Sequence, residues 1–486
     1  MLRPLVLNAR QTAVSMSSRR LQVVAKHLSG MTPADEAPVL FKSEGKTRSY
    51  ILNRPAALNT LNETMIDMLG TQIKEWNENK LCQLIIGRGN GRAFCAGGDV
   101  KDIVGNAADP KKQPDAIRFF KKEVRPTKRF ELDFAFATLT KPYVSVMDGY
   151  TMGGGVGLSI GAPFRIATEA SSFAMPEAKI GYSPDVGATY FLPRLDGELG
   201  TYLALTSNAI TGRTIHEFGL ATHFVPQRRL RALLAALSSL SDSSSEAINR
   251  TIEEHSAEIS PEDPHATFGG ERRKVLDACF SHNSVDLIIK DLKDVASSTG
   301  SQARWAQETL DAILARSPTG LRVALQAVRR GKHLELADAL QMEMGIATAF
   351  CTGASPDFIT GVTHLLINKA KDRADWSPAT LEDTPEDVIK NFFDDSPFVR
   401  RAPRLDLDRK IIPGDKFSRF ALPNEATIEA AVKGSLPGSG SFALTPTELI
   451  SSFERRCGRK TGLQQKIKDV IDRKCQLEDG YLTWRP

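Results

Sequence analysis

The chain has 486 residues and a formal net charge of +5, with 41% hydrophobic and 25% charged residues. These values are ordinary for a soluble globular protein, and so small a net charge does not by itself imply a nucleic-acid partner. No window approaches the roughly 18 uninterrupted apolar residues of a membrane span, so we expect no membrane partner. Six scattered cysteines, without a C-x-x-C pair or a histidine at zinc-ligand spacing, predict no structural metal and no disulfide.

The first 34 residues differ in composition from the rest. They contain several serines, and no acidic residue precedes Asp35. The basic residues are Arg3, Arg10, Arg19, Arg20 and Lys26. This composition is typical of a mitochondrial transit peptide. We therefore expect residues 1–34 to direct import into the mitochondrial matrix and exclude them from the fold; a basic terminus with no targeting role is the alternative.

From residue 39 the apolar pattern predicts short strands alternating with helices. In chain order these are a hairpin at 39–53, a helix at 61–76, a strand at 83–87, helical sequence at about 111–139, a strand at 141–149, and a turn, helix and strand at 152–168. The repeated order of strand, strand and helix favours an α/β architecture with helices packed outside the sheets.

Beyond residue 200 the pattern is almost entirely helical as far as about 395. The residue pattern then changes, and "GSLPGSGS" at 434–441 is typical of a linker. The segment 455–474 contains eight basic and two acidic residues around a stripe of Leu463, Ile467, Val470 and Ile471. Such a helix either packs on its own domain or docks onto RNA or an acidic partner.

Two motifs that suggest other enzymes fail on context. "GKT" at 45–47 lacks the first glycine of a phosphate loop and lies between predicted strands. "GLSIG" fits the G-x-S-x-G pattern, but Ser159 follows the apolar strand by about ten residues, within the predicted helix. We expect a buried helical serine there; an α/β-hydrolase using Ser159 would instead lose activity on Ser159→Ala.

Two glycine clusters and two acids remain as the candidate site. "RAFCAGGD" at 92–99 and "TMGGGVG" at 151–157 leave backbone N–H groups free near helix starts, as a developing oxyanion requires. Glu177 and Asp185 follow in an apolar segment, each directly after a proline. A carboxylate held in such a pocket can attack a carbonyl or activate a water molecule.

These motifs carry a resemblance. Together with "NRPAALNTLNETM" at 53–65 and "FRIATEASSFAMPEAKIGYSPDVGATYFLPRL" at 164–195, they resemble the crotonase superfamily, and within it the 3-hydroxyisobutyryl-CoA hydrolase family. The resemblance implies a spiral of stacked ββα turns, an acyl-CoA ligand and no cofactor. It divides the chain into a ββα core with the acyl-CoA site at 38–200, a helical part at 201–397, and an extension with linker and basic helix at 398–486.

The resemblance also assigns roles to residues. Backbone N–H groups of Gly98 and Gly154 would form the oxyanion hole. Glu177 falls on the family's catalytic position, and Asp185 falls on the second carboxylate typical of the hydrolase branch, where it would bind the substrate hydroxyl or orient water. Hydratases of the superfamily carry a further catalytic glutamate where this chain has Gly157, which argues against a hydratase.

One substitution puts catalysis in question. Arg129 stands where the family commonly has a substrate-contacting glutamate, and Glu131 lies two residues further on, on another helical face. A cation at this point would pair with Asp185 or Glu177 and weaken either one as a base.

The expected function is therefore hydrolysis of 3-hydroxyisobutyryl-CoA to 3-hydroxyisobutyrate and CoA, a step of valine catabolism. The alternative comes from the same resemblance, because some members of the family are proteins of the mitochondrial small ribosomal subunit. The basic C-terminal extension and Arg129 favour such a partner. The two functions do not exclude each other.

Overall fold

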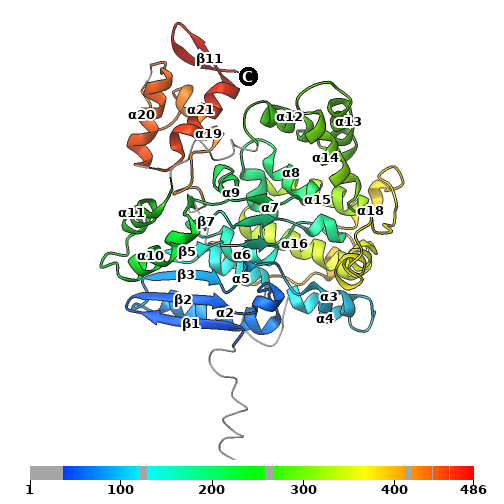
Figure 1. Cartoon of the computed structure of the whole chain (residues 1–486). Coiled ribbons are helices and arrows are strands. Elements are labelled where there is room, and N and C mark those ends of the chain that lie inside the picture. Colours follow the sequence, from blue (N-terminus) through cyan, green and yellow to red (C-terminus); the bar gives the residue numbers. More distant parts are fainter. Residues whose placement is uncertain are drawn as a thin grey trace, which may run out of the picture.

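The computed structural model describes residues 37–120, 129–257, 268–410, 417–440, 442–458 and 460–485. The expected transit peptide, residues 1–34, lies outside these ranges. The described chain folds into two β-sheets surrounded by helices, with residues 422–485 set against one end of the body (Figure 1).

The larger sheet has six strands in the order β1-β2-β3-β5-β7-β10, and the smaller has four in the order β4-β6-β8-β9. The larger sheet is formed by β1 (Val39–Glu44), β2 (Thr47–Leu52), β3 (Leu84–Gly89), β5 (Tyr143–Val146), β7 (Phe164–Ala167) and β10 (His223–Phe224). The smaller sheet is formed by β4 (Ala93–Cys95), β6 (Tyr150–Met152), β8 (Ser172–Ala174) and β9 (Ile210–Thr211). The first hairpin, β1 with β2, is antiparallel as the sequence predicts.

The spiral follows from the way consecutive strands divide between the sheets. β3, β5 and β7 lie side by side and parallel in the larger sheet, while the strands that follow them, β4, β6 and β8, are parallel neighbours in the smaller one. Helices α3 and α6 follow β4 and β6, so each turn is a ββα unit. The expected α/β spiral is confirmed.

Helices of the first half and of the central region cover the sheets. They are α2 (Glu63–Glu78), α3 (Val100–Ala107), α4 (Gln113–Phe120), α5 (Arg129–Ala137), α6 (Gly154–Ile160), α7 (Ala188–Phe191), α8 (Leu199–Thr206), α9 (Arg213–Glu217), α10 (Gln227–Ser238) and α11 (Ser245–His255). Short turns of helix lie at η2 (Pro55–Ala57), η3 (Glu177–Ile180), η4 (Leu192–Arg194), η5 (Thr363–Ile367) and η6 (Val399–Arg401).

The C-terminal half is mostly helical. Its helices are α12 (Gly270–Phe280), α13 (Val285–Ala296), α14 (Ala303–Leu314), α15 (Pro318–Gly331), α16 (Leu336–Cys351), α17 (Asp357–Val362), α18 (Glu386–Lys390), α19 (Glu425–Val432), α20 (Pro446–Cys457) and α21 (Leu463–Lys474). They are followed by a hairpin of β11 (Cys475–Glu478) and β12 (Tyr481–Trp484). None of the helices in the described ranges combines the length and apolar character needed to cross a membrane.

The second half is almost entirely helical from about 200 to 395, as the sequence predicts, but one of its expected boundaries needs correction. Two short strands within it, β9 and β10, add edges to the two sheets. Each has only two residues, too few to show a strand period in the sequence. The change of residue pattern near residue 398 does not end the core, since Leu405 is buried within the main apolar cluster and Phe417 packs against it.

The C-terminal extension therefore has a later start as a structural unit. Its own apolar cluster begins at Leu422 and includes Leu449, Ile467 and Leu482. The predicted linker falls inside this unit, between α19 and α20, where Leu436 packs on the same cluster. We call residues 422–485 the C-terminal unit.

Candidate active site

The sheet topology brings three of the predicted site residues to one edge. β4, β6 and β8 are parallel, so their carboxyl ends point the same way. Gly98 follows β4, Gly154 follows β6, and Glu177 follows β8, each by two or three residues. Carboxyl ends of parallel strands are the usual place for a ligand site in α/β proteins.

The two glycine clusters touch each other at this edge. A Cβ added to Gly154 would lie 3.3 Å from the carbonyl carbon of Gly97. The parallel bridge between Leu61 and Gly98 uses the Gly97 carbonyl and the Asp99 amide, so the Gly98 amide takes no part in it. Gly154 is the first residue of α6, where backbone N–H groups have no intrahelical acceptor. The geometry is compatible with a pair of oxyanion donors.

Glu177 lies against the start of α6. Its side chain is buried, and its Oε1 is 2.9 Å from the point where a Cβ on Gly153 would stand. Gly153 also has a φ of +46°, so only glycine fits this position comfortably. Burial, reinforced by the charge of Asp185, raises the pKa of Glu177 well above its ordinary value. A raised pKa makes a carboxylate a stronger base, as general acid–base catalysis requires.

Asp185 is engaged by Arg129. The guanidinium Nη2 of Arg129 lies 3.3 Å from Asp185 Oδ1, and the Tyr182 hydroxyl donates to Oδ2 at 3.5 Å. Burial raises the pKa of Asp185, while Arg129 and Tyr182 oppose the rise. Burial alone would lower the pKa of Arg129, but the nearby carboxylates raise it above its ordinary value. The pair expected from the substitution at 129 is thus present, with Asp185 rather than Glu177.

Glu131 points away from the pocket. Its Oε1 accepts a hydrogen bond from the backbone N–H of Asp406 at 2.8 Å. It therefore does not replace the glutamate that Arg129 displaces.

Two buried acids near the site were missed in the sequence. Asp133 lies on α5, one helical turn after Arg129, and Glu343 lies on α16, where it accepts hydrogen bonds from the amides of Gly187 and Thr189. Burial raises the pKa of Asp133 well above its ordinary value and that of Glu343 to about 8. Each is a single acidic residue within an apolar stretch of helix, and this pattern in the sequence could have identified it as a buried acid. We call Arg129, Asp133, Glu177, Asp185 and Glu343 the carboxyl cluster.

Asp133 explains the glycine at 157. A Cβ at Gly157 would lie 2.3 Å from Asp133 Oδ1, so no side chain fits there while α5 keeps its position. The carboxyl group that faces this part of α6 comes from α5.

Ser159 plays the structural role expected for it. Its hydroxyl is buried and donates to the carbonyls of Gly155 and Val156, at 2.9 and 3.1 Å, within α6. This arrangement is that of an ordinary helical serine, and it gives no support to a nucleophile elbow.

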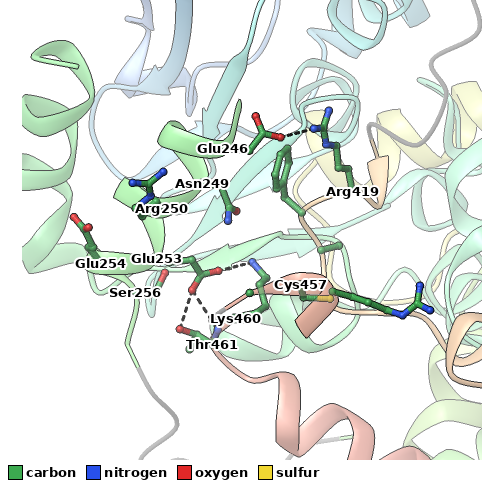
Figure 2. Close-up of a pocket in the computed structure, with 14 residues that line it drawn as sticks. Glu246, Asn249, Arg250, Glu253, Glu254, Ser256, Arg419, Cys457, Lys460 and Thr461 are labelled. Atoms are coloured by element: carbon green, nitrogen blue, oxygen red, sulfur yellow. Dashed lines mark hydrogen bonds and ion pairs between the residues drawn. The ribbon is translucent and has the colours of Figure 1, made fainter. Parts of the chain in front are cut away.

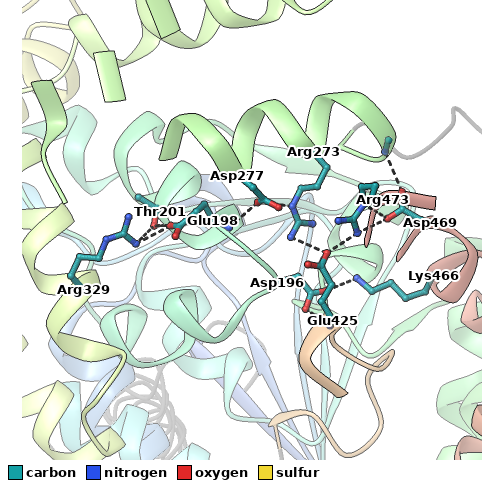
Figure 3. A network of polar contacts seen from close by, with 11 residues as sticks. Asp196, Glu198, Thr201, Arg273, Asp277, Arg329, Glu425, Lys466, Asp469 and Arg473 are labelled. Atoms are coloured by element: carbon teal, nitrogen blue, oxygen red, sulfur yellow. Dashed lines mark hydrogen bonds and ion pairs between the residues drawn. The ribbon is translucent and has the colours of Figure 1, made fainter. Parts of the chain in front are cut away.

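The basic helix α21 turns much of its charge inward. Lys466 forms an ion pair with Asp196 of the core, and Arg473 pairs with Glu425 at 2.6 Å (Figure 3). Arg273 of α12 lies 3.1 Å from the same Glu425 carboxylate. The contacts of Lys466 with Asp196 and of Glu425 with Arg273 join the C-terminal unit to the core, while the pair of Arg473 and Glu425 lies within the unit.

A second set of contacts reinforces this attachment. Lys460 is buried and its amine lies 2.7 Å from Glu253 Oε1 of α11, while Thr461 donates to Oε2 of the same carboxylate at 3.0 Å (Figure 2). They lie in a cleft of about 950 Å³ that is also lined by Arg250, Arg419 and Arg456. We call both sets of buried contacts the junction.

The two sheets and their ββα turns define an α/β spiral with the candidate site at one edge of the small sheet, and comparison with known proteins identifies the family. The family described as enoyl-CoA hydratase/isomerase matches residues 47–393. The chain therefore belongs to that family, the crotonase superfamily.

Two kinds of relative are similar to this chain. The small ribosomal subunit protein mS47 of Neurospora crassa is 38% identical over 97% of this chain and 92% of its own length. The mitochondrial 3-hydroxyisobutyryl-CoA hydrolase of Mus musculus is also 38% identical, over 78% of this chain and 94% of its own length. Sequence identity does not distinguish the two kinds of relative, but the share of this chain that each one covers does.

Solved structures give the same fold. A carnitinyl-CoA dehydratase from Mycobacterium thermoresistibile matches with a TM-score of 0.64 and 31% identity, over 74% of this chain and 98% of its own. An enoyl-CoA hydratase from Rhodobacter sphaeroides matches with a TM-score of 0.60 and 28% identity, over 73% of this chain and 97% of its own.

Proposed function

We propose that this protein is a component of the mitochondrial small ribosomal subunit, built on a crotonase scaffold and located in the matrix. The observation that carries the proposal is the coverage of the relatives. The Neurospora protein aligns with 97% of the chain, whereas the mouse hydrolase aligns with 78%. The difference is large enough to include the C-terminal unit.

The structure of the C-terminal unit supports a role for the whole chain. A loosely tethered tail would have no need of counter-ions in the core, yet Lys460 is buried against Glu253 and Lys466, with a side chain only 10% exposed, pairs with Asp196. These ion pairs hold the unit against the core. This favours assembly into a larger complex over attachment by a flexible basic tail.

The arginine at position 129 also favours the ribosomal proposal. The ion pair between Arg129 and Asp185 neutralises the carboxylate that typifies the hydrolase branch. A protein kept for assembly can tolerate this change, whereas a dedicated hydrolase would lose a base or a substrate ligand.

Sedimentation tests the proposal. Mitochondrial lysate containing the tagged full-length chain would be separated into ribosomal subunits on a sucrose gradient, with a matrix enzyme of similar mass as marker. We expect the chain to migrate with the small subunit after a salt wash and the marker to stay near the top. A chain that remains with the marker would contradict the proposal. Truncation at 397 would not test the C-terminal unit alone, because it would also remove Leu405 and Phe417, which help to form the main core.

A second function, thioester hydrolysis, is favoured by one specific observation. Gly98, Gly154 and Glu177 meet at one edge of the small sheet in an arrangement suited to an acyl thioester. In that reaction Glu177 would attack the carbonyl or activate water, and the two glycine amides would stabilise the oxyanion.

Release of free CoA from 3-hydroxyisobutyryl-CoA measures this activity. Glu177→Gln should lower turnover by about 10²–10⁴-fold, the range for a positioned acid or base. Arg129→Glu, which restores the family residue, should raise turnover by roughly tenfold or more by releasing Asp185. Equal rates in all three proteins would discard hydrolysis and leave the ribosomal proposal intact.

A further inference from the structure

One carboxyl group of the carboxyl cluster has both of its oxygens fully buried and without a hydrogen-bond partner among the described residues. Asp133 is 4% exposed, and neither Oδ1 nor Oδ2 meets a donor within the described part of the chain. Glu343 and Asp185 both have donors. Glu177 also has a buried oxygen, Oε2, without a donor, but the proposed chemistry gives that carboxyl a role. Buried polar groups in proteins almost always have partners, so Asp133 requires an explanation.

Neither packing nor charge balance explains why an acid stands at position 133. The neighbours of Asp133 include Gly157 and Val186, against which an apolar side chain of similar size would pack as well. Arg129, one turn earlier on α5, already has Asp185 as its partner. An unpaired buried carboxyl costs stability, and such costs are typically retained at functional sites.

A small cavity lies beside this carboxyl. It measures about 30 Å³, enough for one water-sized group. Its lining comes from α5, α6, the loop at 186–187, α7 and α16, together with Phe417. Asp133 contributes the one charged side chain of that lining. A hydrogen-bond donor arriving in the cavity would therefore meet the Asp133 carboxyl.

The cavity lies in line with the proposed site along α6. Gly157 follows Gly153 by one turn, with its amide donating to the Gly153 carbonyl at 3.2 Å. Glu177 packs against Gly153, and Asp133 packs against Gly157. Positions one turn apart on a helix are about 5–6 Å apart. An acyl chain that runs along α6 from the Gly154 amide thus brings a substituent a few bonds from its carbonyl to Asp133.

We propose that Asp133 selects for a hydroxyl group on the acyl chain of a bound CoA thioester. The inference rests on acyl-CoA binding at this site, the second function proposed above. A hydroxyl both donates and accepts hydrogen bonds, and a protonated carboxyl does the same. The raised pKa of Asp133 favours that protonated form. Asp185, which the family resemblance assigns to the substrate hydroxyl, is held instead by Arg129 and Tyr182.

Binding of two thioesters tests the proposal without requiring turnover. Titration calorimetry would compare 3-hydroxyisobutyryl-CoA with isobutyryl-CoA, which lacks only the hydroxyl, on the full-length chain carrying Glu177→Gln. We expect the hydroxylated thioester to bind about tenfold or more tightly, the range for a hydrogen bond to a carboxyl group. Asp133→Val and Asp133→Ala should abolish the preference and leave affinity for isobutyryl-CoA within about twofold. Asp102→Ala, at an exposed position of α3, should keep it.

The outcomes separate this inference from the functions proposed above. A preference that persists in folded Asp133→Val or Asp133→Ala would overturn the role of Asp133 while leaving acyl-CoA binding in place. Equal affinity for both thioesters in the protein that keeps Asp133 would also overturn the role of Asp133. Failure of both thioesters to bind would overturn the inference together with the acyl-CoA site, whereas the ribosomal proposal depends on sedimentation alone. The near-isosteric Val variant guards against loss of folding in the Ala variant.

Discussion

The carboxyl cluster and the junction both bury several charged side chains, but they satisfy them differently. At the junction each buried charge meets an opposite one, as in Lys466 with Asp196 and Lys460 with Glu253. In the carboxyl cluster four carboxyl groups share one guanidinium, and Asp133 has no donor at all among the described residues. Pairing each charge with an opposite one limits the cost of burying it in a structural attachment, although Nη2 of Arg273 and Nη1 of Arg473 have no hydrogen-bond partner among the described residues. Incomplete pairing leaves hydrogen-bonding capacity for a ligand.

The pH response of the two regions should differ in sign, because burial raises the pKa of an acid in the carboxyl cluster and lowers the pKa of a histidine beside the junction. Glu343 has a pKa of about 8 in the folded chain, above its unfolded value, so its contribution to stability is lost as pH rises through that range. His223, which contacts the junction residue Glu253, has a pKa of about 4, below its unfolded value, so its contribution is lost as pH falls.

The largest effect is expected from breaking the junction. Lys466→Ala leaves the Asp196 carboxylate buried without its cation, which should lower the free energy of unfolding by about 3–5 kcal/mol. Urea unfolding measures the change. The double variant Asp196→Asn/Lys466→Ala should recover part of the loss, because no uncompensated charge remains. A loss below about 1 kcal/mol in the single variant would show that the junction is not a structural attachment.

A smaller effect is expected from acidification. His223 lies beside Glu253 at 3.2 Å, and burial lowers its pKa to about 4. Below about pH 6.5 the unfolded chain takes up this proton first, so stability should fall by up to about 1.4 kcal/mol per pH unit down to pH 4. His223→Gln should remove this part of the slope, leaving the share of His216, which has the same sign. An unchanged slope in urea unfolding between about pH 7 and 5 would contradict the assignment.

In the carboxyl cluster the expected effect on stability has the opposite sign. Asp133→Val removes an unpaired buried carboxyl and should raise the free energy of unfolding by about 1 kcal/mol. Thermal or urea unfolding checks it. Destabilisation by more than about 1 kcal/mol would mean that Asp133 is a structural group, like those at the junction.

The smallest effect is expected where an ion pair is exposed. Arg304 and Glu308 on α14 are 2.9 Å apart, with side chains 91% and 62% exposed. Arg304→Ala should change stability by no more than about 0.5 kcal/mol. It serves as the matched control for Lys466→Ala, and a comparable loss in both would remove the distinction between buried and exposed pairs.

Much of the fold was predictable because its strands and glycine turns are local features. The order of Gly98, Gly154 and Glu177 along the chain mirrors the parallel order of β4, β6 and β8. Asp133 was not predictable as a site residue, since its neighbourhood depends on how α5 packs against Gly157 of α6. The same holds for Glu343, whose hydrogen-bond donors lie 154 or more residues away.

The burial of side chains on the basic helix α21 was only partly predictable from the sequence. The apolar stripe of α21 correctly predicted which face is buried, with Leu463, Ile467 and Val470 in the cluster of the C-terminal unit. It did not show that Lys466 also turns inward, because the partner of Lys466, Asp196, is 270 residues away in the chain. Docking on RNA through the whole basic face of α21 is therefore not available to the folded chain.

The ribosomal assignment can be tested by the amount of this chain in salt-washed small ribosomal subunits. Quantitative mass spectrometry would compare that amount with the amounts of other proteins of the same subunit. We expect a near-stoichiometric ratio, which Glu177→Gln should leave unchanged. A small fraction of a copy per subunit, with most of the chain in the soluble matrix, would contradict the ribosomal assignment.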